Sequence, residues 1–294
     1  MNDVPRSAAL LFPNSGGTSR PRFKAPPGAC DCHAHVYDPR FPMAWPSLPA
    51  VFDASVREYR LLQERIGTQR VVFVQPAAYG TDNRVTVDAI AQLGTNAARG
   101  VAVAHSTIAD EELASLHEAG IRGLRFSIHD PHTEIAGADM IEPLAARIHA
   151  LGWHVQLHAR GEQIAAMEEM LASLPCAIVI DHLARVPQPE GAHHPAIPAL
   201  KRLLDGGRTW VKLCAPYLDS RVGSPRFADM RPVARALIEH APERMLWGSD
   251  WPHPTEPHTK PDDAALLDLL QEWVGDERTR KRILVANPAE LYGF

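Results

Sequence analysis

Two short stretches, one near each end of the chain, hold the residue types that could carry out hydrolytic chemistry. The first is Cys30-Asp31-Cys32-His33-Ala34-His35, in which two histidines stand two positions apart in a segment that reads as extended. Successive side chains of a strand point to opposite faces, so His33 and His35 should share one face. The second stretch, Trp247 to His253, places Asp250 after an apolar run. Imidazoles can hold zinc or polarise a carbonyl, and a carboxylate can serve as a ligand or as a general base.

Polar side chains also stand where each of the other apolar segments is expected to end. A single histidine at such a position is most often structural. Several histidines and an aspartate on different segments are harder to explain by structure alone, so these positions are candidates for one shared site. In chain order, the residues at or just past the segment ends are His33 and His35, Gln75 and Tyr79, His105, Arg125 and His129, His158, Asp181 and His182, Cys214 and Tyr217, and Asp250 and His253.

Short apolar segments rich in β-branched residues alternate along the chain with amphipathic stretches of helical period. The expected strands are 29–36, 70–75, 100–104, 123–127, 154–158, 177–182, 210–214 and 245–250. The expected helices are 54–66, 82–97, 111–119, 140–151, 162–174, 197–204, 228–240 and 262–273, followed by one or two closing helices over 277–291.

Eight strand-then-helix units in 294 residues match a single (β/α)8 TIM barrel in count and in length. Continuously apolar runs such as Val71–Val74 and Ile178–Ile180 fit strands that helices cover on one face and a barrel interior on the other. An open doubly wound sheet is the alternative. It needs a Gly-rich phosphate turn after the first strand, where this chain has His-Ala-His-Val-Tyr-Asp-Pro. The pattern therefore favours the barrel.

The longest connections all follow expected strands, so they should gather at the carboxyl ends of the strands, where barrel active sites are built. These connections are 37–53, 129–139, 185–196 and 216–227. Residues 1–28 are rich in Pro, Gly, Ser and Arg and have no periodicity, which predicts an extended N-terminal arm before a barrel over 29–294.

The overall composition excludes several classes of protein. A net charge of -5 and a pI near 6.3 do not predict the basic face that nucleic-acid binding needs. No apolar run approaches the roughly 20 residues of a membrane helix, and no secretory signal is recognisable. Four cysteines in so long a chain argue against a disulfide framework and favour a reducing cytoplasm. The oligomeric state stays open.

The site motifs, taken together, resemble the amidohydrolase superfamily. His33-x-His35, His158, His182 and Asp250 follow the first, fifth, sixth and eighth expected strands as they do in that superfamily. The finer resemblance, over residues 29–294, is to the lactonase branch that includes 2-pyrone-4,6-dicarboxylate lactonase. The motifs that carry it are Val74-Gln75-Pro76 with Gly80-Thr81-Asp82-Asn83, Arg122-Gly123-Leu124-Arg125-Phe126, Ile180-Asp181-His182, Trp247-Gly248-Ser249-Asp250-Trp251-Pro252-His253 and Asn287-Pro288.

The resemblance implies a hydrolase that opens a small, carboxylate-bearing lactone. It implies that Asp250 activates the water and that histidines polarise the carbonyl, directly or through one divalent ion such as zinc. The implied catalytic residues are Asp250, His182, His33 and His35. The implied substrate contacts are Arg125, Tyr79, Tyr217, Gln75 and His129. The implied metal ligands are His33, His35, His158 and Asp250.

Three departures from the family pattern bear on the metal and the substrate. Arg125-Phe126-Ser127 stands where many members carry a lysine or glutamate that bridges two metals, so a binuclear centre is not expected. His158 stands where the pyrone-dicarboxylate enzyme lacks a histidine, so a single zinc ion and a metal-free site stay equally open. His129-Asp130-Pro131 and Pro216-Tyr217-Leu218 replace further arginines of that enzyme, which favours a different anionic lactone as substrate.

The same barrel is compatible with three other functions. A related barrel could decarboxylate an aromatic or muconate-type acid with a single metal ion. A lactone isomerase could move the acyl oxygen within its substrate. A barrel without chemistry could only bind a ligand, although a pure binding protein has no need for four histidines and Asp250 together.

Overall fold

The structure, a computed structural model, describes residues 12–48, 51, 54–131 and 135–294, and it confirms the predicted barrel. Eight parallel strands pair in sequence order, from β1 to β8. The eight strands are β1 Cys30–Ala34, β2 Arg70–Val74, β3 Ala98–Ala102, β4 Ile121–Ser127, β5 His154–His158, β6 Ile178–Ile180, β7 Thr209–Leu213 and β8 Met245–Trp247. Each coincides with an expected strand to within a few residues.

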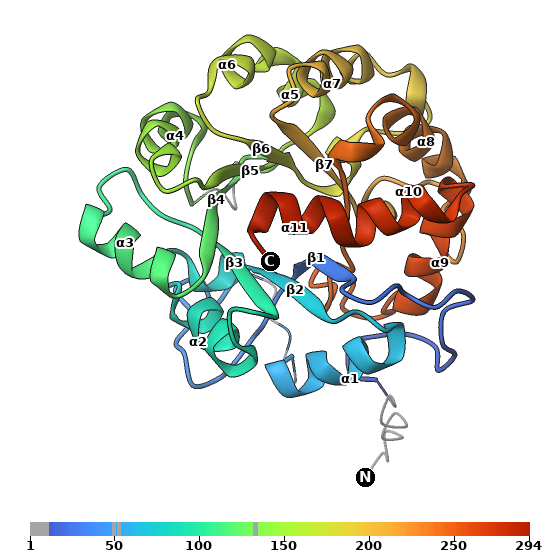
Figure 1. Cartoon of the computed structure of the whole chain (residues 1–294), viewed down its shortest axis with the longest axis horizontal. Helices are drawn as coiled ribbons and strands as arrows, with labels where there is room; N and C mark the ends of the chain where they lie inside the picture. Colours follow the sequence, from blue (N-terminus) through green and yellow to red (C-terminus); the bar gives the residue numbers. More distant parts are fainter. Residues whose placement is uncertain (1–11, 49–50, 52–53, 132–134) are drawn as a thin grey trace.

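Helices alternate with the strands and form the outer wall (Figure 1). The expected helix over 162–174 is divided at Met167 into two short helices, and the C-terminal tail forms one continuous helical run of three parts. The helices are α1 Val56–Ile66, α2 Arg84–Leu93, α3 Asp110–Glu118, α4 Ile141–His149, α5 Gly161–Ala166, α6 Glu168–Ser173, α7 Ala196–Asp205, α8 Arg231–His240, α9 Asp263–Trp273, α10 Glu277–Lys281, the π-helical η8 Arg282–Ala286 and α11 Asn287–Tyr292. Short 3-10 turns occur at η1 Ala77–Tyr79, η2 Ala138–Met140, η3 His182–Arg185, η4 Gly191–His193, η5 Pro216–Leu218, η6 Ala228–Met230 and η7 Pro242–Arg244.

The barrel closes where the segment after β8 meets β1. The backbone N–H of Asp250 donates to the carbonyl of His33 over 2.8 Å, and that of His35 donates to the carbonyl of Trp251 over 2.7 Å. A side chain at Gly248 could not be accommodated, because its Cβ would lie 2.6 Å from the Cβ of His33. This close approach brings the two predicted stretches together.

Asp31 joins the same two segments from behind. Its buried carboxylate accepts hydrogen bonds from the backbone N–H of Ser249 over 2.9 Å and from the Ser249 hydroxyl over 2.6 Å. It also accepts from the N–H of His33 and from the hydroxyl of Tyr59 on α1. Burial raises the pKa of Asp31 to about 6. One side chain therefore ties β1, the end of β8 and the first helix together.

The C-terminal helical run closes the amino end of the barrel, so the site must lie at the other end. In Figure 1, α11 crosses the middle of the ring of strands. Asn287 donates to the carbonyl of Met245, the first residue of β8, and the buried ring of Tyr292 packs against His154, the first residue of β5. Cys30, Cys32 and valines of neighbouring strands pack around Tyr292 and fill this end of the interior.

The described part of the arm, residues 12–28, contains neither helix nor strand and lies against α1 and α9. Arg65 of α1 donates to the Ser15 hydroxyl and to the carbonyls of Gly16 and Ser19. The indole N–H of Trp251 donates to the carbonyl of Pro13 over 2.9 Å. The arm is thus anchored directly behind the segment that carries Asp250. Residues 1–11, and parts of the long connections after β1 and β4, lie outside the described residues.

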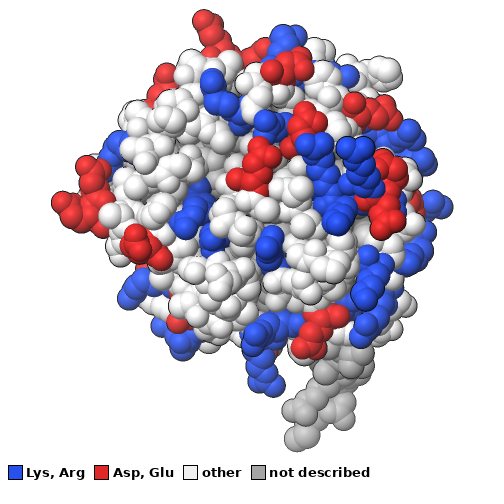
Figure 2. Space-filling model, in the orientation of Figure 1, with Lys and Arg blue, Asp and Glu red and all other residues white. Residues whose placement is uncertain are grey.

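Charged side chains of both signs are interspersed on the face that α11 covers (Figure 2). Among the described residues, no helix combines the length and the apolar character needed to cross a membrane. The four cysteines at positions 30, 32, 176 and 214 are all buried free thiols.

Replacing Asp31 with alanine should strongly destabilise the fold. The substitution leaves buried donors of His33, Ser249 and Tyr59 without their acceptor, and unmet buried donors cost about 1–3 kcal/mol each. We expect the free energy of unfolding, measured by urea denaturation, to fall by about 3 kcal/mol or more. The exposed Asp205→Ala change is the control and should stay within about 0.5 kcal/mol of the parent. Equal effects of the two changes would contradict the role of Asp31.

Candidate active site

A cavity of about 290 Å³ opens at the carboxyl end of the strands. The sequence predicted the site at this end of the barrel. Most of the polar residues that line the cavity do stand at or just past strand ends. The lining residues are His35, Tyr37, Leu48, Pro76, Ala77, Arg125, Ser127, His129, Asp130, His158, His182, Arg185, Leu218, Asp250, Pro254 and Thr255.

Asp250 lines the cavity close to two histidines, His33 of β1 and His35 just after it. Its Oδ1 atom is 3.5 Å from His33 Nε2 and 3.4 Å from His35 Nε2. His35 Nδ1 lies 2.8 Å from the carbonyl of Val74, to which it donates, so His35 presents Nε2 to Asp250. Asp250 has a φ of 63°, a conformation that is costly for a residue with a Cβ. The barrel seam holds it there.

A second set of contacts holds the other carboxylate oxygen of Asp250. The Tyr217 hydroxyl donates to Oδ2 over 2.6 Å and lies 3.0 Å from His253 Nδ1. His253 Nε2 in turn lies 3.2 Å from the buried carboxylate of Asp263. Burial, reinforced by Asp250, raises the pKa of Tyr217 well above its usual value, so the phenol stays protonated and can donate. Tyr217 therefore positions Asp250 from behind and does not line the cavity.

Asp250 is ionised at neutral pH. Burial opposes its charge, but the neighbouring rings of His182, His35 and His33 outweigh that effect and lower its pKa below the usual value. A buried, ionised carboxylate that is fixed at Oδ2 and faces the cavity through Oδ1 is suited to act as a general base.

Directly beneath this group lies a layer of buried charges. Lys212 of β7 has no exposed surface. Its ammonium donates to Gln156 Oε1 over 2.7 Å and lies 3.2 Å from His33 Nδ1. Asp181 Oδ1 lies 3.5 Å from Lys212 Nζ and 3.2 Å from the same His33 nitrogen. Arg125 Nε donates to Asp181 Oδ2 over 3.1 Å. Burial opposes the charge of Asp181, but His33, Lys212 and Arg125 hold its pKa well below the usual range.

His33 and His182 are both neutral rings. Burial, and next the Lys212 ammonium, lower the pKa of His33 well below its usual value. Burial lowers the pKa of His182 to about 4. His182 Nδ1 lies 3.2 Å from the thiol sulfur of Cys214, which leaves Nε2 on the cavity side, 3.5 Å from Arg125 Nη2. With its proton on Nε2, a neutral imidazole can donate a hydrogen bond to a developing oxyanion; in the other tautomer Nε2 accepts from Arg125 instead.

Cationic side chains form a further part of the cavity wall. Arg125 and Arg185 flank His158, with Nη2 of Arg125 3.3 Å from Nδ1 and Nη1 of Arg185 3.3 Å from Nε2. The rings of His158 and His129 stack with their centroids 3.8 Å apart. Burial lowers the pKa of both histidines, and that of His129 falls to about 4. Two guanidinium groups beside two neutral imidazoles make this wall suited to an anionic group.

An unusual backbone supports His182 and Arg185. The four residues of η3, His182 to Arg185, all have φ between 45° and 60°, in the left-handed region. Such a run is costly for residues with side chains, so the surroundings must hold it. Arg185 contributes to this through its Nε, which donates to Asp219 Oδ2 over 2.8 Å. The turn delivers both side chains to the same cavity.

One group of residues at the site fits a divalent metal ion. The ligand atoms of His33, His35 and Asp250 lie within 4.8 Å of one another, with both Nε2 atoms 3.4–3.5 Å from Asp250 Oδ1, and His33 Nε2 is buried without a hydrogen-bond partner. Ligands bound at the usual zinc distances in a tetrahedral site are about 3.3 Å apart, close to the spacings seen here. His33, His182 and Cys214 form a second cluster with suitable donor atoms. His158 belongs to neither cluster, because both of its ring nitrogens face arginines.

Three predicted substrate contacts do not reach the cavity: Tyr217, which lies behind Asp250, and two others. Gln75 is fully buried, and its side-chain amide bonds to the carbonyls of Gly80 and Asp82 and to the Thr86 hydroxyl. The hydroxyl of Tyr79 bonds to the backbone of Asp38, in the connection after β1. Both side chains shape the connections around the site. Arg125 and His129 do line the cavity.

Sequence reasoning missed Lys212 and Tyr37. Lys212 carries a signal that could have been recognised, since a lysine in the middle of the apolar run Trp210–Cys214 must be buried with a partner. Tyr37 lines the cavity from the connection after β1, and burial raises its pKa, so it is present as a neutral phenol. Nothing in the local sequence distinguishes Tyr37 from a packing residue.

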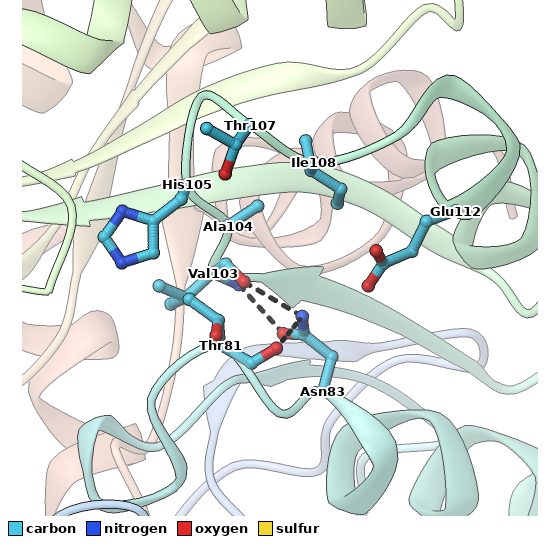
Figure 3. Close-up of a pocket in the computed structure, with 8 residues that line it drawn as sticks. All are labelled: Thr81, Asn83, Val103, Ala104, His105, Thr107, Ile108 and Glu112. Carbon is cyan, nitrogen blue, oxygen red and sulfur yellow. Dashed lines mark hydrogen bonds between the residues drawn. The ribbon is translucent and has the colours of Figure 1, made fainter.

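A second hollow, of about 210 Å³, lies beside the ends of β2 and β3 (Figure 3). His105, one of the strand-end residues, lines this hollow and not the main cavity. The amide of Asn83 bonds to the carbonyl of Thr81 and to both backbone polar groups of Val103. These hydrogen bonds join two neighbouring connections, and the exposed His105 has no buried acid or base beside it in this hollow.

Comparison with known proteins agrees with this geometry. The family model described as Amidohydrolase matches residues 30–294. The chain belongs to the amidohydrolase family. It is 34% identical over 284 residues to a 2-pyrone-4,6-dicarboxylate hydrolase of Comamonas testosteroni, covering 93% of each chain. It is 34% identical over 298 residues to a 4-sulfomuconolactone hydrolase of Rhizobium radiobacter, covering 99% of each.

A solved structure shares the arrangement of the barrel. An apo protein from Agrobacterium tumefaciens is 31% identical and has a TM-score of 0.88, covering 96% of this chain and 98% of that one. The resemblance predicted from the strand-end motifs is therefore confirmed, and the amidohydrolase family accounts for nearly the whole chain.

Proposed function

We propose that this amidohydrolase hydrolyses a small lactone that bears a carboxylate or another anionic group. The observation that carries the proposal is that one cavity holds both a base and a cationic wall. Asp250 Oδ1 faces His33 and His35, while Arg125 and Arg185 line the same cavity. The pyrone-dicarboxylate and sulfomuconolactone hydrolases, which resemble the chain over nearly its full length, are both named for anionic lactones.

Asp250 takes a proton from the attacking water. Its carboxylate is ionised, and the hydrogen bond from Tyr217 fixes Oδ2, so Oδ1 is the oxygen free to accept the proton. The hydroxide equivalent adds to the lactone carbonyl and gives a tetrahedral oxyanion. Collapse of this intermediate breaks the bond between the acyl carbon and the ring oxygen, and the proton held on Asp250 goes to the leaving alkoxide.

The oxyanion forms next to hydrogen-bond donors that are already in place. The guanidinium of Arg125 is one such donor, and its Nη2 lies 3.5 Å from His182 Nε2. Neutral His182 is a second donor in the tautomer that carries its proton on Nε2, with Nδ1 accepting from the Cys214 thiol. Such donors need no reorganisation when the charge develops, and removing one from a hydrolase typically costs about 100- to 1,000-fold in kcat.

The anionic group of the substrate binds at the wall formed by Arg185, Arg125 and His129. Arg185 is half-buried and projects from the η3 turn, and it keeps Asp219 as its partner through Nε, which leaves other guanidinium N–H groups for a ligand. A guanidinium meets a carboxylate or sulfonate with paired hydrogen bonds, which gives orientation as well as affinity.

We propose zinc as the ion that His33, His35 and Asp250 would hold, because two imidazoles and a carboxylate are ligands that zinc favours. When bound, zinc would polarise the carbonyl and lower the pKa of a coordinated water. The buried free thiols fit the reducing cytoplasm, which we propose as the location.

Asp250→Asn should fold normally and lose most of its turnover. The amide keeps the size of the side chain and can still accept from Tyr217, but it cannot take a proton from water. We expect kcat to fall by about 100- to 10,000-fold, measured with a pH indicator on a panel of carboxylated and sulfonated lactones.

The surface change Asp205→Asn is the control and should be as active as the parent. Normal turnover by Asp250→Asn would reject the assignment of the base. Carbon dioxide release from an acid, or acyl transfer within the lactone without a ring-opened product, would identify a decarboxylase or an isomerase instead.

Arg185→Met should weaken binding of anionic lactones while leaving kcat within a few-fold of the parent. A charge-assisted hydrogen bond contributes about 1.5–3 kcal/mol, so KM should rise by roughly ten- to a hundredfold. Arg221→Met, an exposed arginine on the neighbouring connection, is the matched control and should leave KM unchanged. If neutral and anionic lactones lose affinity equally, Arg185 does not recognise the anion.

A further inference from the structure

The hydrogen bonds around His33 determine whether its Nε2 atom can bind a metal ion. A neutral imidazole carries one proton, and the nitrogen that carries it cannot be a ligand. A ligand at Nε2 therefore requires the proton on Nδ1. Metal-binding histidines usually donate that Nδ1 or Nε2 proton to a carboxylate or carbonyl, which fixes the tautomer.

Two buried groups, a hydrogen-bond acceptor and a hydrogen-bond donor, compete for His33 Nδ1. The Asp181 carboxylate lies 3.2 Å away and could only accept a proton from Nδ1. The Lys212 ammonium also lies 3.2 Å away and could only donate to it. The lysine contact has hydrogen-bond geometry, whereas Asp181 Oδ1 makes no hydrogen bond with any described residue. The structure thus favours the lysine.

We propose that Lys212 is a positioning residue that holds His33 with its proton on Nε2, so that binding of a divalent cation requires this hydrogen bond to break. In this tautomer Nε2–H points toward Asp250 Oδ1, 3.5 Å away, and His33 supports the base. In the other tautomer Nδ1–H donates to Asp181, and His33, His35 and Asp250 form a cation site. Lys212 keeps Gln156 and Asp181 as partners in both states.

Substitutions of Lys212 and Asp181 should change the affinity for Zn²⁺ in opposite directions. Lys212→Met removes the donor and leaves Asp181 as the partner of Nδ1, so affinity for Zn²⁺ should rise. Asp181→Asn replaces the charged acceptor that favours the metal-binding tautomer with a weaker, neutral one, so affinity should fall. Changes to the groups behind a metal-binding histidine typically alter affinity by about 10- to 100-fold, and we expect shifts of that size in each direction.

Zinc affinity of the chelator-treated full chain would be measured by competition with a chromogenic chelator, without substrate. This readout does not depend on the lactonase proposal. Lys260→Met is the matched control, since this half-buried lysine donates to the carbonyls of Pro252 and His253 and not to His33. It should leave zinc affinity unchanged. Equal gains in Lys212→Met and Lys260→Met, or no gain in Lys212→Met, would overturn the proposal.

A measurement on the unsubstituted protein keeps the proposal testable if Lys212→Met does not fold. Side-chain ¹⁵N spectra distinguish protonated from unprotonated ring nitrogens, and His33→Gln would assign the signals. The metal-free protein should show His33 protonated on Nε2, and added Zn²⁺ should move the proton to Nδ1. A proton on Nδ1 in the metal-free protein would overturn the proposal.

Discussion

The closing seam of the barrel is the constraint on which the site depends. The first and last strands lie more than two hundred residues apart in the chain, and the seam alone sets the distance from His33 and His35 to Asp250. Two backbone hydrogen bonds, of 2.7 and 2.8 Å, and the Asp31–Ser249 contacts fix that distance. The seam also holds Asp250 at a positive φ, so part of the stability of the barrel is used to orient the base.

The buried charges beneath the seam are costly unless they are paired, and this explains their arrangement. An isolated ammonium or carboxylate in the interior is very unfavourable. Here Lys212 and Asp181 lie next to each other, and each also forms a hydrogen bond with the side-chain amide of Gln156. The same layer separates the apolar end of the barrel around Tyr292 from the reactive end. Alternation along β5 follows this division, with His154 at the bottom, Gln156 in the charged layer and His158 at the cavity.

Much of this organisation could be predicted from the sequence, because it follows from periodicity. The strand positions and the convergence of His33, His35, His182 and Asp250 required only alternation and barrel topology. The partners of individual polar atoms were not predictable in the same way. His158 stands at a strand end as expected, yet its ring nitrogens face arginines. Gln75 forms its hydrogen bond with the backbone of the connection that follows it, at Asp82. Such choices depend on loop conformations, including the left-handed η3 turn, that no local pattern specifies.

Arg125 belongs to two parts of the site at once. Its Nε binds Asp181 in the charged layer, and Nη2 reaches the cavity beside His158 and His182. An anion bound at Nη2 would therefore share this guanidinium with Asp181, whose other oxygen lies near Lys212 and His33. The anion-binding wall and the base are in this way one electrostatic unit. Arg185 pairs with Asp219 instead, so it can contribute charge to substrate binding without disturbing the protons around His33.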